Sequence, residues 1–376
     1  MSFRLRVLQS LVLGLIGLSL ILYTSLFSSP VQIYRIEPPH SSHETINSTI
    51  RLINHTEHDT RVQRSSNSNT SIKNEMSIKH DPPQVSEKEL KSTLKIPPKK
   101  SQKGIFTKDV YDAGHTIPNA ELCPDLGRNM KLMVLITSSP DHSEPRMAIR
   151  QTWGHFGQRK DIGIAFVVGI AKTDQMNNAI QSEMDMYGDI IQSRFIDHYD
   201  NLTLKTVSIF EWVDNYCSEV PFMLKTDDDM FINIPKLLSL TDKQQNVKRT
   251  IFGRLARKWK PIRNSSSKYY VSTTQYPQSF FPDFTTGPAY LVSKDSLHDL
   301  FVNSLNATYL KLEDVFMTGV VAQNISVKRI HVTEFFNKRI PFNVCNIRKS
   351  ISIHMVKFHE QFILWEKLHD TRIRCK

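Results

Sequence analysis

The chain has 376 residues, of which 40% are hydrophobic, and its formal net charge at pH 7 is +11. This length allows one large domain or two ordinary ones, and the hydrophobic content excludes a wholly disordered chain. The positive charge favours an anionic partner, for which nucleic acids, diphosphates and glycans are candidates.

Residues 7–27 carry no charge. As a helix rising 1.5 Å per residue they would be about 30 Å long, which matches the apolar core of a bilayer. Arg4 and Arg6 precede this segment, and no basic residue follows it until Arg35, so the positive-inside rule places residues 1–6 in the cytosol. We therefore predict a single transmembrane signal anchor. A cleaved signal peptide is the alternative, although the apolar run is longer than a usual signal-peptide core.

Residues 28–121 are predicted to form a disordered lumenal stem before a catalytic domain at 122–376. No Phe, Trp or Tyr occurs between Arg35 and Ile105, so this part cannot bury enough apolar surface to offset its ordering entropy. A lumenal protein meets no nucleic acid, which leaves diphosphates and glycans as partners. Seven N-x-S/T sequons support a secretory-pathway lumen and are candidate glycosylation sites: Asn47, Asn54, Asn69, Asn201, Asn264, Asn306 and Asn324.

All four cysteines follow the stem, and none lies in a C-x-x-C pair. In an oxidising compartment this favours two disulfides over zinc ligation, with three possible connectivities. Cys123 precedes the first expected strand, and Cys217 ends the helix before the acidic strand. Both can therefore lie at one edge of the sheet, and we predict a Cys123–Cys217 bond. Cys345 and Cys375 bracket the C-terminal segment and are predicted to pair.

From residue 122 onwards, strand and helix patterns alternate. This order predicts an α/β fold with a mainly parallel sheet and helices on both faces. No G-x-G-x-x-G, P-loop or G-x-S-x-G motif occurs, which gives no support to dinucleotide-binding, P-loop or esterase-type sites. The expected strands are 132–136, 164–168, 190–191 and 222–226. Three helices are expected: one starts at 143, a second ends near 188, and a third spans 201–216.

Three successive carboxylates, Asp227, Asp228 and Asp229, follow the strand expected at 222–226 and precede another apolar run. Adjacent carboxylates resist burial unless a cation or a hydrogen-bond network offsets their repulsion. In open α/β sheets ligands bind at the carboxyl ends of strands, and hard divalent cations combine carboxylate with phosphate oxygens. The segment predicts a metal and nucleotide site; a solvated acidic turn is the alternative.

Two further features bear on chemistry. Glu313 and Asp314 stand in an apolar run that extends to residue 321, where a carboxylate serves either as a helix cap or as a general base. His354 alternates with apolar residues near the C-terminus, and its imidazole would complete a metal site that carboxylates began, although a lone histidine on a strand is more often structural.

Several segments together resemble the β1,3-glycosyltransferases of glycosyltransferase family 31, most closely the β1,3-galactosyltransferase branch. The resemblance runs from about Cys123 to Cys375 in the family's order. It rests on AIRQTWG at 148–154, FIDHYDNLTLKT at 195–206, LKTDDDMFIN at 224–233, the YP and TGPAY segments at 276–277 and 286–290, and LEDVFMTG at 312–319.

This resemblance implies a type II Golgi membrane enzyme with a GT-A-like fold that uses a UDP-sugar and Mn²⁺ and inverts the anomeric carbon. The family's D-x-D motif falls on the aspartate cluster, so Asp229 would bind the metal with His354, and Asp227 would face the ribose. Its E-D-V motif gives Asp314 the role of base, and Glu313 would position the acceptor or the loop. We also assign Asp228, Arg150 and Lys225 to the donor.

The family commonly has C-S-G-x-G where this chain has Thr-Thr-Gly-Pro-Ala at 285–289. That segment lies near the acceptor in the family, so Tyr276, Phe284 and Gly287 become acceptor-side candidates while the acceptor stays open. Aromatic residues at 276–293 suit a sugar site, with core packing as an equal alternative. Galactose is the expected sugar; N-acetylglucosamine and N-acetylgalactosamine remain alternatives.

Two other classes of function are compatible with parts of the pattern. An inactive lumenal glycan-binding homologue would keep the aromatic residues but lose the base, whereas this chain retains both acidic motifs. A metal-dependent phosphohydrolase would need more His and Asp ligands near the first cluster. Release of UDP only when an acceptor is present separates a transferase from a hydrolase.

Overall fold

The computed structural model describes residues 104–375. The predicted cytosolic tail, anchor and most of the stem, with Asn47, Asn54 and Asn69, lie outside the described residues. In the described part, no helix is long and apolar enough to cross a membrane.

A mixed sheet of eight strands forms the centre, in the order β1-β4-β3-β2-β5-β8-β7-β9. The strands β4, β3, β2 and β5 are parallel, as the sequence predicts, whereas β8 runs antiparallel to both β5 and β7. At the edges β1 is antiparallel to β4, and β9 is parallel to β7. The bounds are β1 (His115–Ile117), β2 (Leu132–Thr137), β3 (Ile162–Ile170), β4 (Ile190–Ile196), β5 (Phe222–Asp227), β7 (Thr250–Ala256), β8 (Phe284–Ser293) and β9 (Lys328–His331).

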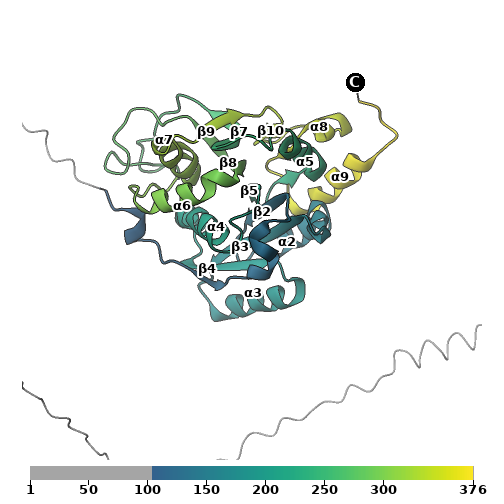
Figure 1. Ribbon diagram of the computed structural model, residues 1–376, viewed down its shortest axis with the longest axis horizontal. Helices are drawn as coiled ribbons and strands as arrows, with labels where there is room; N and C mark the ends of the chain where they lie inside the picture. Colours follow the sequence, from purple (N-terminus) through teal and green to yellow (C-terminus); the bar gives the residue numbers. More distant parts are fainter. Residues whose placement is uncertain (1–103, 376) are drawn as a thin grey trace, which may run out of the picture. The chain divides into compact units, whose positions relative to one another are not determined.

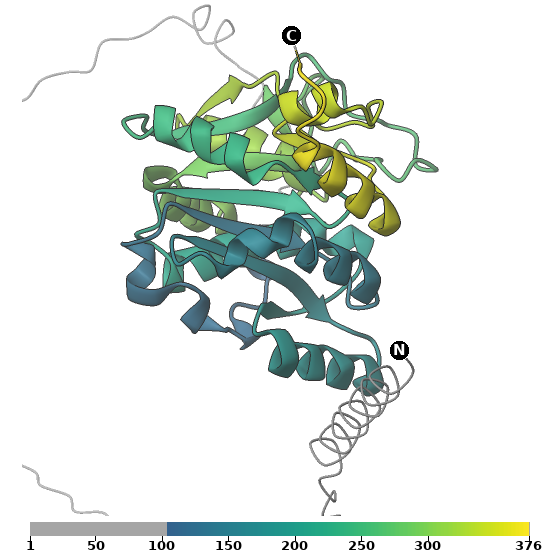
Figure 2. The ribbon, with the colours of Figure 1, turned by 90° about the vertical axis from the view of Figure 1, so that its right-hand side faces the viewer.

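Helices cover both faces of this sheet (Figure 1). One face carries α4 (Leu202–Tyr216), α6 (Leu297–Leu305) and α7 (Ala322–Asn324), and the other carries α2 (Ser143–Arg150), α3 (Asp174–Tyr187), α5 (Ile234–Lys243), α8 (Val344–Lys349) and α9 (Phe358–His369). In Figure 2, helices of this second face lie in front of the sheet. Short 3₁₀ turns span Thr107–Asp109, Ala120–Leu122, Pro124–Gly127, Trp153–Gln158, Tyr199–Asn201 and Lys294–Ser296, and a π-helix spans Val315–Val321.

Side chains that alternate along β2 separate the two cores. Leu132, Val134 and Ile136 pack against the face of α2 and α5, while Met133 and Leu135 pack against that of α4. Both faces of a parallel strand are buried here, so β2 reads as a continuous apolar run rather than an alternating one.

A second, three-stranded sheet holds the C-terminal part beside the aspartate cluster. It has the order β10-β11-β6, formed by β10 (Phe335–Phe336), β11 (Ser352–Ile353) and β6 (Phe231–Ile232). β11 is antiparallel to β6, which begins two residues after Asp229. Residues more than 100 positions apart in the sequence therefore meet at one point.

The folded region starts earlier than the predicted boundary at 121/122. β1 joins the main sheet through β4, Phe106 bridges to Thr308, and the hydroxyl of Tyr111 donates to the carboxylate of Glu211. The stretch without aromatic residues that marks the stem ends at Ile105. The return of aromatic residues after it locates the start of the domain better than the first strongly apolar strand does.

The structure contains two disulfides, Cys123–Cys217 and Cys345–Cys375, which is the predicted pairing. Gly127 packs against the first bond: its φ is +84°, and a Cβ there would lie 2.9 Å from the Cys123 Sγ. Only glycine accommodates this combination of backbone and close approach.

The four sequons in the described part differ in accessibility. Asn264, Asn306 and Asn324 are exposed. Asn201 is half-buried, and its side-chain amide donates to the Ile196 carbonyl at 2.9 Å.

Candidate active site

Asp227 ends β5 and is tied to the neighbouring strand. Thr137 lies opposite Asp227 in the parallel pairing of β2 and β5, and its hydroxyl donates to Asp227 Oδ1 at 2.6 Å. Lys225 Nζ donates to the same oxygen at 2.7 Å. The carboxylate is thus held at the carboxyl edge of the sheet, where the sequence predicts a ligand site.

Asp228 turns toward the loop that follows β2. Its Oδ2 accepts from Ser138 Oγ at 2.7 Å and contacts His142 Nδ1 at 2.8 Å. That hydrogen bond raises the pKa of His142 above its usual value. Arg146, fully buried, donates to Ser138 Oγ at 3.0 Å and to the Ser139 carbonyl at 2.6 Å, and so fixes the loop.

Asp229 meets His354 across the small sheet. The distance from His354 Nε2 to Asp229 Oδ2 is 3.2 Å, with side chains 25% and 47% exposed. Burial lowers the pKa of His354, but the hydrogen bond and charge of Asp229 outweigh it, and the net shift is upward. A carboxylate and an imidazole are both suited to a divalent metal. No group of three or more His, Cys, Asp or Glu side chains gathers as a metal site among residues 104–375, so oxygens of the substrate or of water would complete the coordination.

Lys225 links the cluster to the second acidic motif. Its side chain is buried, and Nζ donates to Asp227 at 2.7 Å, to Glu313 Oε1 at 3.0 Å and to the Gly287 carbonyl at 3.0 Å. An ammonium has three donors, so all of them are used within the protein. Lys225 therefore positions Asp227 and Glu313 in the wall of the site, and its assignment to donor binding stays a prediction.

Glu313 is buried and accepts three hydrogen bonds. Oε1 accepts from Lys225, and Oε2 accepts from Thr206 Oγ1 at 3.0 Å and from the Tyr290 hydroxyl at 3.2 Å. Burial raises the pKa of Glu313 to about 7 in spite of the nearby ammonium.

Asp314 is half-buried and less constrained. Oδ2 accepts from the Gly287 N–H at 3.0 Å, and Oδ1 accepts from the Val315 N–H at 2.8 Å, at the start of the π-helix. A carboxylate has about four acceptor positions, so each oxygen keeps capacity for a further proton donor. Burial raises the pKa of Asp314, and the two backbone hydrogen bonds only partly oppose this shift.

These groups border one cavity of about 480 Å³ at the carboxyl edge of the sheet. Asp227, Asp228, Asp229 and Glu313 line it, and Asp314 is the next residue along the chain. Other lining residues are Thr137, Ser138, Ser139, His142, Asp197, His198, Tyr199, Leu202, Lys205, Thr206 and Lys225. The arrangement offers a cation and phosphate site beside a second carboxylate pair.

Comparison with known proteins decides the family. The profile of the family described as Galactosyltransferase matches residues 144–333, half of the chain. Human beta-1,3-galactosyltransferase 5 is 36% identical over 245 residues, covering 64% of this chain and 79% of the relative. The chain belongs to the galactosyltransferase family. It is therefore a glycosyltransferase, and its family implies a nucleotide-sugar donor and a glycan acceptor.

A second group of relatives is less similar in sequence. Mouse beta-1,3-galactosyltransferase 1 is 31% identical over 248 residues, which cover 65% of this chain and 76% of the relative. A solved galactosyltransferase, LgtC in complex with donor and acceptor sugar analogs, is 9% identical with a TM-score of 0.34, covering 64% of this chain and 97% of the other.

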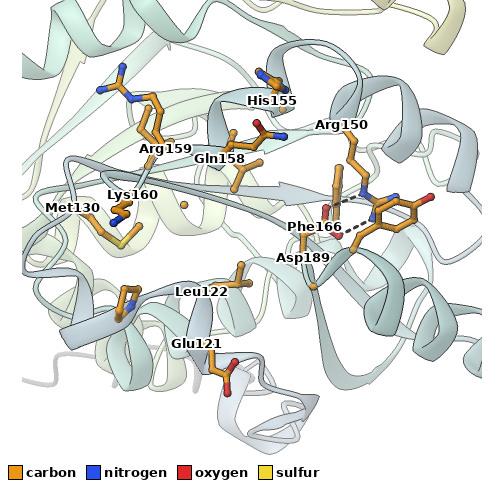
Figure 3. Close-up of a pocket in the computed structure, with 18 residues that line it drawn as sticks. Glu121, Leu122, Met130, Arg150, His155, Gln158, Arg159, Lys160, Phe166 and Asp189 are labelled. Atoms are coloured by element: carbon orange, nitrogen blue, oxygen red, sulfur yellow. Dashed lines mark hydrogen bonds and ion pairs between the residues drawn. The ribbon is translucent and has the colours of Figure 1, made fainter.

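Arg150 does not lie with the other predicted donor residues. It borders a different cavity of about 560 Å³, next to the starts of β3 and β4 (Figure 3). Its guanidinium binds Asp189 at 2.7 and 2.8 Å and Glu183 at 2.7 Å, and lies over the Tyr187 ring. Seven residues of helix, about 10 Å, separate Ser143 from Arg150, so α2 carries the arginine away from the acids. The assignment of Arg150 to the donor is therefore corrected.

The acceptor-side candidates have three different environments. Phe284 is 1% exposed and packs in the core, so it cannot present its ring to a sugar, which corrects that assignment. Tyr276 is half-buried, and its hydroxyl donates to the Phe280 carbonyl at 2.8 Å. Gly287 lies at the site, since a Cβ there would approach Glu313 Oε1 to 2.6 Å.

Sequence analysis missed a second buried lysine in the cavity wall. Lys205 Nζ donates to the Ser138 carbonyl at 2.6 Å and pairs with Asp197 Oδ2 at 2.8 Å. A lysine inside the apolar face of α4 was the available signal, because buried lysines are rare unless they are paired. Arg146, one helical turn before Arg150, is the arginine that supports the site.

Proposed function

We propose that the enzyme transfers galactose from UDP-galactose to the 3-hydroxyl of an acceptor sugar, with inversion, on a GT-A-like domain. The observation that carries the proposal is the Lys225 ammonium, which joins the aspartate cluster to Glu313 beside one cavity. The cluster suits a metal and a diphosphate, and the second carboxylate pair suits proton removal. The linkage and sugar are supported by the names of the human and mouse relatives.

Asp314 is the proposed base. An acceptor hydroxyl is a weak nucleophile at neutral pH, and inversion needs a carboxylate on the face of the sugar opposite the departing UDP. Each Asp314 oxygen accepts one backbone N–H and keeps acceptor capacity, whereas the buried Glu313 already accepts three hydrogen bonds, one of them from an ammonium. Asp314 takes the hydroxyl proton, and Glu313 keeps Lys225 and the loop of Gly287 in place.

Asp227 and Asp228 are proposed to border the nucleotide, and Asp229 with His354 to hold Mn²⁺. Support comes from the pair's 3.2 Å separation, its partial exposure and its mixed oxygen and nitrogen donors. When bound, the ion would neutralise the charge that develops on the diphosphate leaving group. The side chains of the three aspartates have different partners: Thr137 for Asp227, Ser138 for Asp228 and His354 for Asp229.

We also propose that residues 7–27 anchor the enzyme in the Golgi membrane, with the catalytic domain in the lumen. The two disulfides support an oxidising compartment. Protease treatment of sealed Golgi vesicles tests this: a C-terminal tag should be protected until detergent is added, and digestion without detergent would contradict it.

The function is tested with the full-length enzyme in detergent and Mn²⁺. UDP-galactose, UDP-N-acetylglucosamine and UDP-N-acetylgalactosamine are each supplied with and without a mixture of acceptor glycans. We expect UDP release from UDP-galactose only with acceptors, and a new 3-linked galactose in the product. Equal release without acceptor would indicate a hydrolase, and faster transfer of either N-acetylhexosamine would reassign the donor.

A further inference from the structure

The loop 257–283, between β7 and β8, is strongly basic. It contains five Lys or Arg residues and one acid, Asp283. Arg257 Nε lies 3.4 Å from Asp283. Within the described part of the chain, no carboxylate lies within 4 Å of Lys258, Lys260 or Lys268, so three exposed ammonium groups have no ionic partner there.

Exposed aromatic rings accompany these lysines. Trp259, Tyr269 and Phe280 are 55%, 45% and 48% exposed. Lys260 Nζ lies 5.3 Å from the Phe280 ring centre, and Lys268 Nζ lies 4.9 Å from that of Tyr269. Rings that are open on one face and flanked by cations suit a ligand that is both a sugar and an anion.

Internal hydrogen bonds and a buried aromatic residue hold loop 257–283 in one conformation. Arg263 donates to four backbone carbonyls, those of Val271, Ser272, Tyr276 and Gln278, at 2.7–3.0 Å. Phe281 is buried in the core, and its N–H donates to the Trp259 carbonyl at 2.8 Å. Arg263 is thereby committed to the loop, which leaves the three lysines for a ligand.

One side-chain contact and the strand order place this loop at the mouth of the active site. Lys268 Nζ lies 5.6 Å from the ring centre of Tyr199, which lines the catalytic cavity. β7 and β5 are both antiparallel to β8, so β7 delivers the loop to the edge that carries the aspartates. The loop projects from the sheet on the right of Figure 2.

The distance to the base favours the acceptor over the donor. Trp259 packs on Phe284 with 5.5 Å between ring centres, and three strand residues, about 10 Å, separate Phe284 from Gly287, which binds Asp314. Lys258, Trp259 and Lys260 do not line the cavity of the aspartates. A group bound by these three residues would therefore lie outside that cavity.

We propose that loop 257–283 binds an anionic sugar residue, carrying a sulfate or a carboxylate, elsewhere in the same acceptor glycan. Lys258, Lys260 and Lys268 neutralise its charge, and the exposed rings pack against sugar faces. This inference rests on the proposed galactosyl transfer and adds the acceptor class to it.

The test compares matched acceptors that share a terminal sugar and differ by one inner residue: neutral, 6-sulfated or uronic acid. Full-length wild type is set beside a Lys258→Gln, Lys260→Gln and Lys268→Gln triple variant. The triple variant should lose about tenfold or more in kcat/KM for acidic acceptors, mainly through KM, and change little for neutral ones. Lys243→Gln, an exposed lysine at the end of α5, is the control and should change neither.

Three results would overturn the inference. Equal kcat/KM of wild type for acidic and neutral acceptors means that the loop does not select charge. A weaker UDP affinity in the triple variant assigns the lysines to the donor, and a parallel loss of binding to phosphatidylserine vesicles assigns them to a membrane surface. Failure of galactose transfer to every acceptor would instead contradict the proposed function.

In that case the proposal for the loop is tested by binding of the same glycans to the enzyme. Tighter binding of the acidic glycans than of the neutral ones supports the proposal, and equal binding overturns it.

Discussion

Lys225 is a buried cation that holds the carboxylates of Asp227 and Glu313 in place. Replacing it by methionine keeps most of the side-chain length but leaves Asp227 and Glu313 without their shared partner. We expect Lys225→Met to lower the free energy of unfolding by about 3–5 kcal/mol, as for other broken buried pairs, and to abolish transfer. Urea unfolding measures the first effect. Lys243→Met is the exposed control, and equal stability of the two variants would contradict the role of Lys225.

The raised pKa of Asp314 predicts a pH dependence. A base acts only when deprotonated, so kcat/KM should fall as the pH falls through a value above the ordinary range of an aspartate. Measured at saturating Mn²⁺, this acidic limb should persist in Glu313→Gln. Its disappearance in that variant would show that Glu313, whose pKa burial raises to about 7, sets the profile instead.

At the scale of elements, the small sheet brings a distant histidine to the aspartates. β11 pairs with β6, and His354 follows β11 just as Asp229 precedes β6. If both bind the metal, His354→Gln should raise the Mn²⁺ concentration for half-maximal activity by at least about tenfold, since even changes behind a ligand have effects of this size. His359→Gln, exposed on α9, is the matched control. An unchanged Mn²⁺ requirement in His354→Gln would leave the histidine with a structural role.

Elements also explain how far sequence analysis reached. The parallel strands are continuous apolar runs separated by amphipathic helices, and their positions follow from that pattern, including the edge where the aspartates lie. The antiparallel return of β8 and the long loop before it depend on contacts between distant residues, which no local period contains. The predicted sites of Arg150 and Phe284 are wrong for the same reason. The sequence shows that a guanidinium needs an anion and that a ring needs an apolar neighbour, but only the packing shows that these neighbours are Asp189 and Trp259.

At the scale of the whole molecule, the two disulfides close loops of different length. The bonded residues are 94 positions apart for Cys123–Cys217 and 30 apart for Cys345–Cys375. The chain-entropy model then gives about 4.6 and 3.6 kcal/mol, so removing the first bond should cost about 1 kcal/mol more. Denaturant unfolding of the two Cys→Ser double variants tests this order. A larger loss from the C-terminal pair would mean that native packing outweighs loop entropy.

In the proposed mechanism two neighbouring carboxylates have different tasks. Transfer rates of Asp314→Asn and Glu313→Gln, measured with UDP binding for both, test that division most directly. The account predicts that Asp314→Asn lowers kcat by about 10²–10⁴ while UDP binding stays close to that of wild type, because the amide keeps the shape but cannot accept the proton. An inactive Glu313→Gln beside an active Asp314→Asn would assign the base to Glu313, and loss of UDP binding in Asp314→Asn would make Asp314 structural.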